Sequence, residues 1–194
     1  SEWRLPDDRP IIILPGRLTR WKGQTVFIQA IKNLNRKDIQ CLMVGSDQGR
    51  EDYRLELERQ IESYGMQSII HVVDHCDDMP AAYMLTDVVV SASTDPEAFG
   101  RVVVEGQALG RPVIGTNHGG SKETIVEGET GWLAEPNDPD SLAEALTKVL
   151  GLSEEQRVKV AERAIGHIRM HYSKEIMCAK TLDVYNELIA GDAA

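Results

Sequence analysis

The chain has 194 residues, 42% of them hydrophobic, and a formal net charge of −10. This length and composition suit one globular domain with a core of its own. The acidic balance argues against a nucleic-acid-binding surface, which needs a basic stripe, although a local basic pocket for one diphosphate is compatible with an acidic body.

The start of the chain and its three cysteines bear on targeting and compartment. Residues 1–10 are polar and bounded by prolines, without the basic-then-apolar layout of a signal peptide, so we interpret them as a linker to a domain at 11–194. Cys41, Cys76 and Cys178 are far apart and in no metal-binding spacing, which predicts no disulfide framework and favours the cytoplasm. No window approaches the ~20 apolar residues of a membrane span.

Short apolar runs alternate along the chain with longer segments of helical spacing. Ile11 to Leu14, for example, is the kind of run that suits a strand buried on both faces of a parallel sheet. The predicted strands are 11–14, 39–44, 69–73, 87–91, 112–115 and 131–134, and the predicted helices are 23–34, 53–64, 101–109, 140–150, 153–171 and 174–189. This alternation indicates βαβ units, so we expect an α/β fold: a doubly wound, Rossmann-like parallel sheet of about six strands with a C-terminal helical tail.

The loop after the first strand, Gly16 to Gly23, has residue types that suit an anion. In doubly wound sheets ligands bind at the carboxyl ends of the strands, where this loop would lie. Arg17 can direct two hydrogen bonds at phosphate oxygens, and Lys22 adds a point charge. The loop is neither a Walker loop nor a Gly-x-Gly-x-x-Gly fingerprint, which disfavours an ordinary ATP or NAD site. An exposed loop with solvated basic side chains is the alternative.

Two carboxylates follow the fourth predicted strand. Glu97 lies in the loop and Glu105 lies about two helical turns further on, so both side chains can point to the carboxyl edge of the sheet. Free amides at the start of the helix favour an anion there, and the carboxylates can accept hydrogen bonds from sugar or ribose hydroxyls. The alternative is that Glu97 is an ordinary helix-start charge and Glu105 a surface residue, which the run Val102 to Val104 before Glu105 fits poorly.

Four segments occur in an order that is specific, although each alone is weak. They are Gly16-Arg17-Leu18 with Lys22-Gly23, Glu97-Ala98-Phe99-Gly100 with Glu105, Gly119-Gly120-Ser121-Lys122-Glu123, and Gly131-Trp132-Leu133-Ala134-Glu135-Pro136-Asn137-Asp138. Together they resemble the motifs of the group 1 retaining glycosyltransferases (family 4). The resemblance runs from about Ile11 to Leu188 and matches only the carboxyl-terminal domain of that family.

The resemblance implies one half of a GT-B fold, the domain that binds a nucleoside-diphosphate sugar. The acceptor domain would lie on the amino-terminal side, and the full enzyme would transfer the sugar with retention, without a side-chain nucleophile, a cofactor or a metal. Such an enzyme is compatible with peripheral association at the inner face of the membrane.

Roles carried over from the family by position divide the expected site into four groups. Gly16, Arg17 and Lys22 would hold the diphosphate; Glu105 would hold the ribose hydroxyls; Glu97 would touch the donor sugar, with Phe99, Gly100, Arg101, Val102 and Val103 supplying backbone amides; and His71, Val72 and Val73 would lie near the base. Arg17, Lys22 and Glu97 would be the catalytic residues, because negative charge builds on the leaving diphosphate.

Two positions depart from the family pattern. Asp74 stands where glycine is common after the third strand, and Asp tolerates left-handed backbone better than most residues. Gly106 stands where alanine is common; because Gly costs roughly 1 kcal/mol in a helix, we expect a close contact to require it.

Two polar clusters and one histidine have competing interpretations. Asp138-Pro139-Asp140 spells a metal-binding Asp-x-Asp, but its place before a helix favours N-capping, as does Ser153 three residues before Gln156. The run Asp74 to Asp78 lacks zinc spacing, and consecutive side chains rarely converge on one ion. His118 could touch the donor or lie on a solvent-exposed loop.

Two other functions remain as alternatives. A sugar-nucleotide 2-epimerase shares the fold but would need carboxylates and histidines from both domains, and the Glu-x-Phe-Gly pattern favours transfer. A flavodoxin-like binding or receiver module shares the strand–helix alternation, although it usually has five strands and no three-helix tail.

Overall fold

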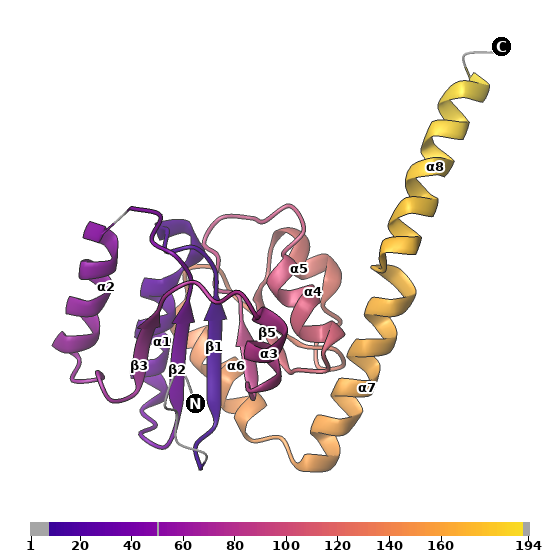
Figure 1. Ribbon diagram of the computed structural model, residues 1–194. Coiled ribbons are helices and arrows are strands. Elements are labelled where there is room, and N and C mark those ends of the chain that lie inside the picture. The colour runs from indigo at the N-terminus through magenta and orange to yellow at the C-terminus, as the bar shows by residue number, and fades with distance from the viewer. Residues whose placement is uncertain (1–7, 50, 192–194) are drawn as a thin grey trace.

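The computed structural model describes residues 8–49 and 51–191, so residues 1–7 of the expected linker lie outside the described part (Figure 1). Six strands form one parallel sheet in the order β3-β2-β1-β4-β5-β6. The strands are β1 (Ile11–Pro15), β2 (Gln40–Val44), β3 (Ile70–Val73), β4 (Val88–Val90), β5 (Val113–Thr116) and β6 (Trp132–Ala134). The predicted doubly wound sheet is confirmed, and its strand order differs from the flavodoxin-like order, which excludes that alternative fold.

The helices follow the strands along most of the chain. They are α1 (Gln24–Leu34), α2 (Glu51–Ser63), α3 (Met79–Met84), α4 (Arg101–Ala108), α5 (Gly119–Thr124), α6 (Pro139–Leu150), α7 (Glu154–His171) and α8 (Lys174–Gly191), with a 3-10 turn, η1 (Arg20–Lys22). Sequence periodicity missed η1, α3 and α5, because elements of three to six residues are too short to repeat an apolar face.

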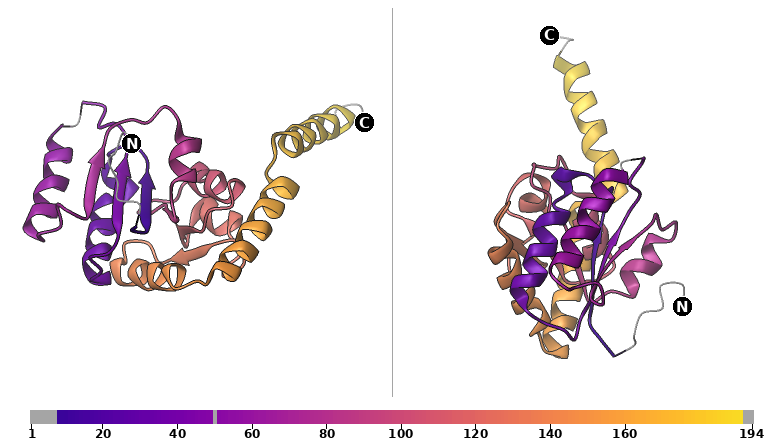
Figure 2. Two further views of the ribbon diagram at one scale, coloured as in Figure 1. Left: turned by 60° about the horizontal axis from the view of Figure 1, so that its bottom comes forward. Right: turned by 90° about the vertical axis from the view of Figure 1, so that its left-hand side faces the viewer.

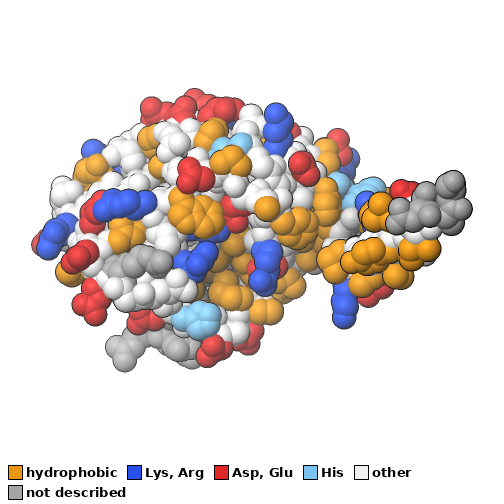
Figure 3. Space-filling model, turned by 90° about the horizontal axis from the view of Figure 1, so that it is seen from above, with side chains coloured by type: hydrophobic (Ala, Val, Ile, Leu, Met, Phe, Trp, Pro, Cys, Tyr) orange, Lys and Arg blue, Asp and Glu red, His pale blue; other side chains and the backbone are white. Residues whose placement is uncertain are grey.

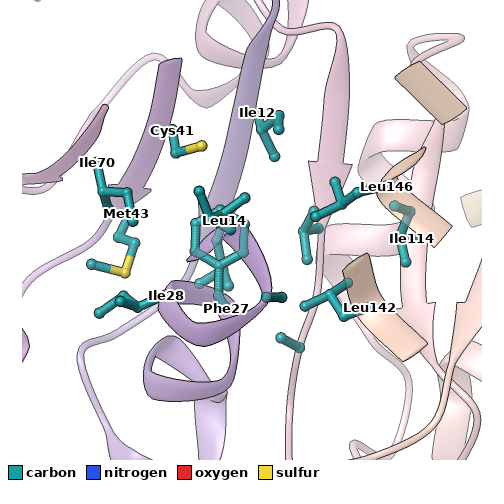
Figure 4. Close-up of a cluster of buried hydrophobic side chains, with 14 of the residues drawn as sticks. Ile12, Leu14, Phe27, Ile28, Cys41, Met43, Ile70, Ile114, Leu142 and Leu146 are labelled. Atoms are coloured by element: carbon teal, nitrogen blue, oxygen red, sulfur yellow. The ribbon is translucent and has the colours of Figure 1, made fainter. Parts of the chain in front are cut away.

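Alternate strand residues enter two apolar layers on opposite faces of the sheet. Ile12, Leu14 and Met43 face α1, α2 and α6 in the larger layer, where Phe27, Ile28, Leu142 and Leu146 complete the packing (Figure 4). Ile13 and Leu42, one position along, face the layer beneath α3 and α4. Figure 2 shows the helices on both faces of the sheet. Because the strands are buried on both sides, side chains leave the core only at the strand ends.

The predicted helix starts at Asp138 and Ser153 are confirmed. Asp138 Oδ1 accepts hydrogen bonds from the amides of Asp140 and Ser141, at 3.0 and 2.9 Å, and caps α6. Ser153 and Gln156 form a reciprocal capping box at the start of α7. Both aspartates of the Asp-Pro-Asp sequence therefore lie at a helix start, as the capping interpretation requires.

The predicted close contact at Gly106 is also confirmed. A Cβ at this position of α4 would lie 2.7 Å from Val113 Cγ1 and 3.4 Å from the side chain of Val89. The glycine therefore lets α4 pack directly on β4 and β5, which places the start of the helix at the carboxyl edge of the sheet.

The last helix projects away from the body of the domain (Figures 1 and 2). Its large apolar side chains are mostly exposed: they are Met177, Leu182, Val184, Tyr185, Leu188 and Ile189, between 54% and 71% exposed. We call this set the α8 apolar face. Among the described residues no helix is both long and apolar enough to pass through a bilayer.

Candidate functional site

A cavity of about 620 Å³ opens at the carboxyl edge of the sheet, between the ends of β1 and β4. This is the point where the strand order reverses, and ligands of doubly wound folds bind there. The lining comes from the loops after β1, β2, β3 and β4, from α3 and from the first turns of α4. Figure 3 looks down on this edge, where Lys and Arg side chains lie among hydrophobic ones. The volume suits a ligand of drug or nucleotide size.

Most of the residues predicted for the site line this one cavity. They are Gly16, Arg17, Lys22, Glu97, Phe99, Gly100, Arg101, Val102 and Glu105. They come from segments more than 70 positions apart in the sequence, since Lys22 and Glu97 are separated by 75. The fold brings them together because β1 and β4 are neighbours and parallel, so both following loops leave the sheet at the same edge.

Lys22 and Glu97 form an ion pair inside the cavity. Lys22 Nζ donates to Glu97 Oε1 at 2.8 Å, and the two side chains are only 13% and 16% exposed. The Ser93 hydroxyl donates to the same carboxylate oxygen, and the Lys22 ammonium lies 4.4 Å from the Trp21 ring centre. Glu97 is therefore held in place by charge-assisted hydrogen bonds, unlike a solvated helix-start charge.

Arg17 differs from Lys22 in its surroundings. Its side chain is exposed at the rim of the cavity, and no carboxylate within residues 8–49 and 51–191 pairs with its guanidinium. The backbone carbonyl of Arg17 accepts a hydrogen bond of 2.9 Å from the Gln24 amide, and Gln24 is fully buried. The backbone of the loop is thus anchored while the guanidinium remains available to an anion.

The segment Gly119-Gly120 fixes the loop that carries Glu97. The Gly120 amide donates to the Glu97 carbonyl at 2.8 Å, and a Cβ on Gly120 would lie 2.3 Å from the Phe99 carbonyl oxygen. Any larger residue would push the two segments apart. The paired glycines therefore have a structural reason that links one predicted motif to another.

The start of α4 faces the cavity without a side-chain cap. Gly100, with φ of 75°, is its N-cap and supplies no side chain to the first-turn amides. Gly100, Arg101 and Val102 all line the cavity. An anion placed there would meet free amides and the positive end of the helix dipole.

Glu105 is held between two partners. Tyr83 donates its hydroxyl to Glu105 Oε2 at 2.9 Å, and Arg101 donates to Oε1 at 2.9 Å. Burial and the negative charge of Glu105 both raise the pKa of Tyr83, so this hydroxyl stays protonated and remains a donor. Both predicted carboxylates, Glu97 and Glu105, thus face the cavity, which excludes a plain surface role for either.

Four predicted residues do not line the cavity. The Val103 side chain is buried in the core and its amide donates to Gly100, while Val72 and Val73 pack against the two apolar layers. His71 Nε2 pairs with Gln40 Oε1 at 2.9 Å, and burial lowers the pKa of this histidine. β3 is the edge strand and β2 separates it from β1, so only the loop after β3 reaches the cavity.

The loop after β3 and helix α3 supply lining residues that were not predicted for the donor site, although His75 and Cys76 were weighed there as part of a possible metal site. They are His75, Cys76, Met79 and Tyr83, with Gly45, Ser46 and Gln48 from the loop after β2. Tyr83 could not be predicted from the sequence, because a helix of six residues is too short for a periodic pattern to show which side chains face inward.

The polar run from Asp74 to Asp78 serves local structure. Asp74 pairs with Arg54 at 2.5 Å, and Asp78 accepts from the Ala81 amide at 3.0 Å as the N-cap of α3. Asp74 does not use the left-handed backbone that Asp tolerates: among the described residues other than glycine, positive φ occurs at Asn35, Gln48 and Asn137.

The structure argues against one of the two interpretations of His118. It lies at the N-cap of α5, outside the cavity lining. Both ring nitrogens are buried, with no hydrogen-bond partner in the part of the chain that the structure describes, so a solvent-exposed histidine is wrong.

Comparison with known proteins agrees with this geometry. Residues 1–167 match the family model described as "Glycosyl transferases group 1". The chain is 30% identical, over 98% of its length, to D-inositol 3-phosphate glycosyltransferase of Corynebacterium glutamicum (strain R), of which it covers 46%. The crystal structure of a glycosyltransferase from Rickettsia africae ESF-5 superposes with a TM-score of 0.92 at 34% identity, over 97% of this chain and 50% of that one.

A third similar protein was crystallised with ligands. Anabaena HepE in complex with UDP and glucose superposes with a TM-score of 0.83 at 28% identity, over 91% of this chain and 48% of that one. The chain thus spans about half the length of the relatives and solved structures named here. The fold, the cavity and the match to the family model lead to one conclusion: this chain belongs to the group 1 glycosyltransferases.

Proposed function

We propose that this chain is the donor-binding domain of a retaining glycosyltransferase of the GT4 type, and that its cavity takes a nucleoside-diphosphate sugar. The observation that carries the proposal is the meeting of two cations, an open helix start and two fixed carboxylates in one cavity. HepE, a similar protein crystallised with UDP and glucose, supports the same ligand class.

In this proposal the chemistry is electrostatic. As the bond between the sugar and the diphosphate breaks, negative charge builds on the leaving diphosphate, and Arg17, Lys22 and the first-turn amides of α4 stabilise it. A leaving phosphate oxygen accepts the proton of the acceptor hydroxyl on the same face of the sugar, so the configuration is retained. Glu97 would orient the sugar, and Glu105 would hold the ribose hydroxyls.

The length of the relatives supports a second domain in the full enzyme. Because the chain spans about half of each, we propose that the acceptor-binding domain lies in the other half. We also propose a cytoplasmic enzyme that can associate peripherally with the inner face of the membrane. The absence of disulfides among Cys41, Cys76 and Cys178 supports the reducing compartment.

The test is a calorimetric panel of UDP, GDP, ADP and their sugars. A hydrogen bond to a charged group contributes about 1.5–3 kcal/mol, so Arg17→Ala/Lys22→Ala should weaken binding roughly 100- to 10,000-fold. Arg20→Ala is the matched control, because Arg20 belongs to the same loop but pairs with Glu56 at 2.6 Å outside the cavity. An unchanged dissociation constant in the double variant would overturn the proposal.

A further inference from the structure

Tyr83 stands out among the cavity residues because its ring belongs to the core while its hydroxyl reaches the site. The side chain is 2% exposed and packs in the layer that contains Val89 and Val103. Its ring is therefore locked by packing, and the hydroxyl projects from a fixed position to Glu105 Oε2.

The other partner of Glu105 is of a different kind. Arg101 reaches Oε1 from one helical turn away, and its side chain is 83% exposed. An exposed pair at this spacing contributes little and holds a carboxylate loosely, since the long side chain moves freely in solvent. Of the two partners, the buried tyrosine is the one that can fix the orientation of the carboxylate.

We infer that Tyr83 is a positioning residue for ribose recognition: it fixes the Glu105 carboxylate so that this group accepts hydrogen bonds from both vicinal hydroxyls of the nucleotide. This inference rests on the proposed function of the cavity. Two vicinal hydroxyls can donate together to one carboxylate only when its plane is set, because each hydrogen bond weakens steeply away from linearity. The Tyr83 bond sets the plane and leaves Oε1 with Arg101, a partner that can yield to the ligand.

We expect Tyr83→Phe to lose affinity for the ribonucleotide selectively. Tyr83→Phe keeps the ring and removes one oxygen, so the fold should persist. Residues in direct contact couple strongly, and we expect the affinity for the preferred ribonucleoside diphosphate to fall about tenfold, while the affinity for its 2′,3′-dideoxy analogue changes less than about twofold. The nucleotide is the one that binds most tightly among UDP, GDP and ADP.

A double-mutant cycle separates positioning from a general structural role. In the Glu105→Ala background, Tyr83→Phe should change the ribonucleotide affinity less than about twofold, because Tyr83 then has no carboxylate to hold. Tyr64→Phe is the matched control: its hydroxyl donates to Gln29 Oε1 at 2.7 Å, away from the cavity. Thermal melting of every variant checks that Tyr83→Phe, alone and combined with Glu105→Ala, stays folded.

Two affinity results would overturn the positioning role of Tyr83 without affecting the donor site. Equal losses for ribonucleotide and dideoxynucleotide, or a further loss in the Glu105→Ala background, would overturn the positioning role while leaving the donor site intact. Retained discrimination in Tyr83→Phe would overturn it as well. If the parent protein binds none of the three nucleotides, the proposed function fails and this inference fails with it.

Discussion

Lys22 and Glu97, from loops that follow different strands, form a largely buried ion pair of 2.8 Å inside the cavity. The pair ties the loop after β1 to the loop after β4, and in our proposal it also divides the ligand, with Lys22 toward the diphosphate and Glu97 toward the sugar. A ligand that brings its own negative charge can replace Glu97 as the partner of Lys22.

Glu97→Gln should therefore separate the two parts of the ligand. We expect the affinity for the nucleoside-diphosphate sugar to fall about tenfold, since a charge-assisted bond to the sugar is lost. The affinity for the nucleoside diphosphate alone should stay equal or rise, because Lys22 is released. Competition calorimetry checks this, with Glu56→Gln as the control, since Glu56 pairs with Arg20 outside the cavity. Equal losses for both ligands would contradict the division.

Donor binding should not depend on a divalent metal. Arg17, Lys22 and the start of α4 already supply positive charge where the diphosphate would lie. We expect the dissociation constant to change less than about twofold between buffer with magnesium and buffer with EDTA. A loss of an order of magnitude with EDTA would instead point to the acidic groups, Glu97 first.

This chain by itself should bind donor without transferring sugar. Proximity and orientation contribute on the order of 7–11 kcal/mol to a two-substrate reaction, and most of this is lost without an acceptor-binding wall. The α8 apolar face, exposed here, is expected to pack on the acceptor-binding domain that we propose. The measurement is turnover with the identified donor and a broad acceptor panel, comparing this chain with the full-length enzyme. Transfer near the full-length rate would show that the other half is dispensable.

Two helical glycines should respond to alanine in opposite directions. At Gly106 a Cβ would meet Val113 at 2.7 Å, and overpacking of this kind costs about 1–3 kcal/mol, more than the ~1 kcal/mol that alanine gains in a helix. At Gly166, in α7, a Cβ would meet nothing within 4 Å. Urea unfolding should show Gly106→Ala destabilised and Gly166→Ala stabilised by up to about 1 kcal/mol. Matching shifts in the two variants would refute the close contact.

Stability should fall as the pH drops below neutral. Burial lowers the pKa of His71 and of His167, the latter with a contribution from the charge of His171. In the unfolded chain these groups protonate near the ordinary value of about 6.5, so below that pH the unfolded state binds more protons. The stability present above this value is lost as the pH falls toward the lower folded pKa values.

Asp38 titrates below this window, because Arg36 lowers the pKa of its carboxyl group to about 2. Urea unfolding at pH 7.5 and 5.5 should thus show a loss of stability that His71→Gln reduces. His75→Gln is the control because the His75 side chain is 70% exposed. A pH dependence unchanged in His71→Gln would assign the effect elsewhere.

Local sequence determined much of this protein. The apolar runs, the caps at Asp138 and Ser153, and the loop chemistry around Arg17 and Glu97 follow from neighbours within a turn or two, and all of these features are present in the structure. Short elements such as α3 escaped prediction because an apolar face needs several turns to repeat.

The tertiary structure alone decided which residues share the cavity. No local sequence pattern predicts that β4 pairs with β1 rather than with β3. This pairing brings Glu97 to Lys22 and leaves His71 outside the cavity. It also placed Tyr83, a core residue by burial, with its hydroxyl on Glu105. The physical reason is that contacts between distant segments depend on how the sheet closes its core, and burial of whole strands outweighs the preference of any single residue.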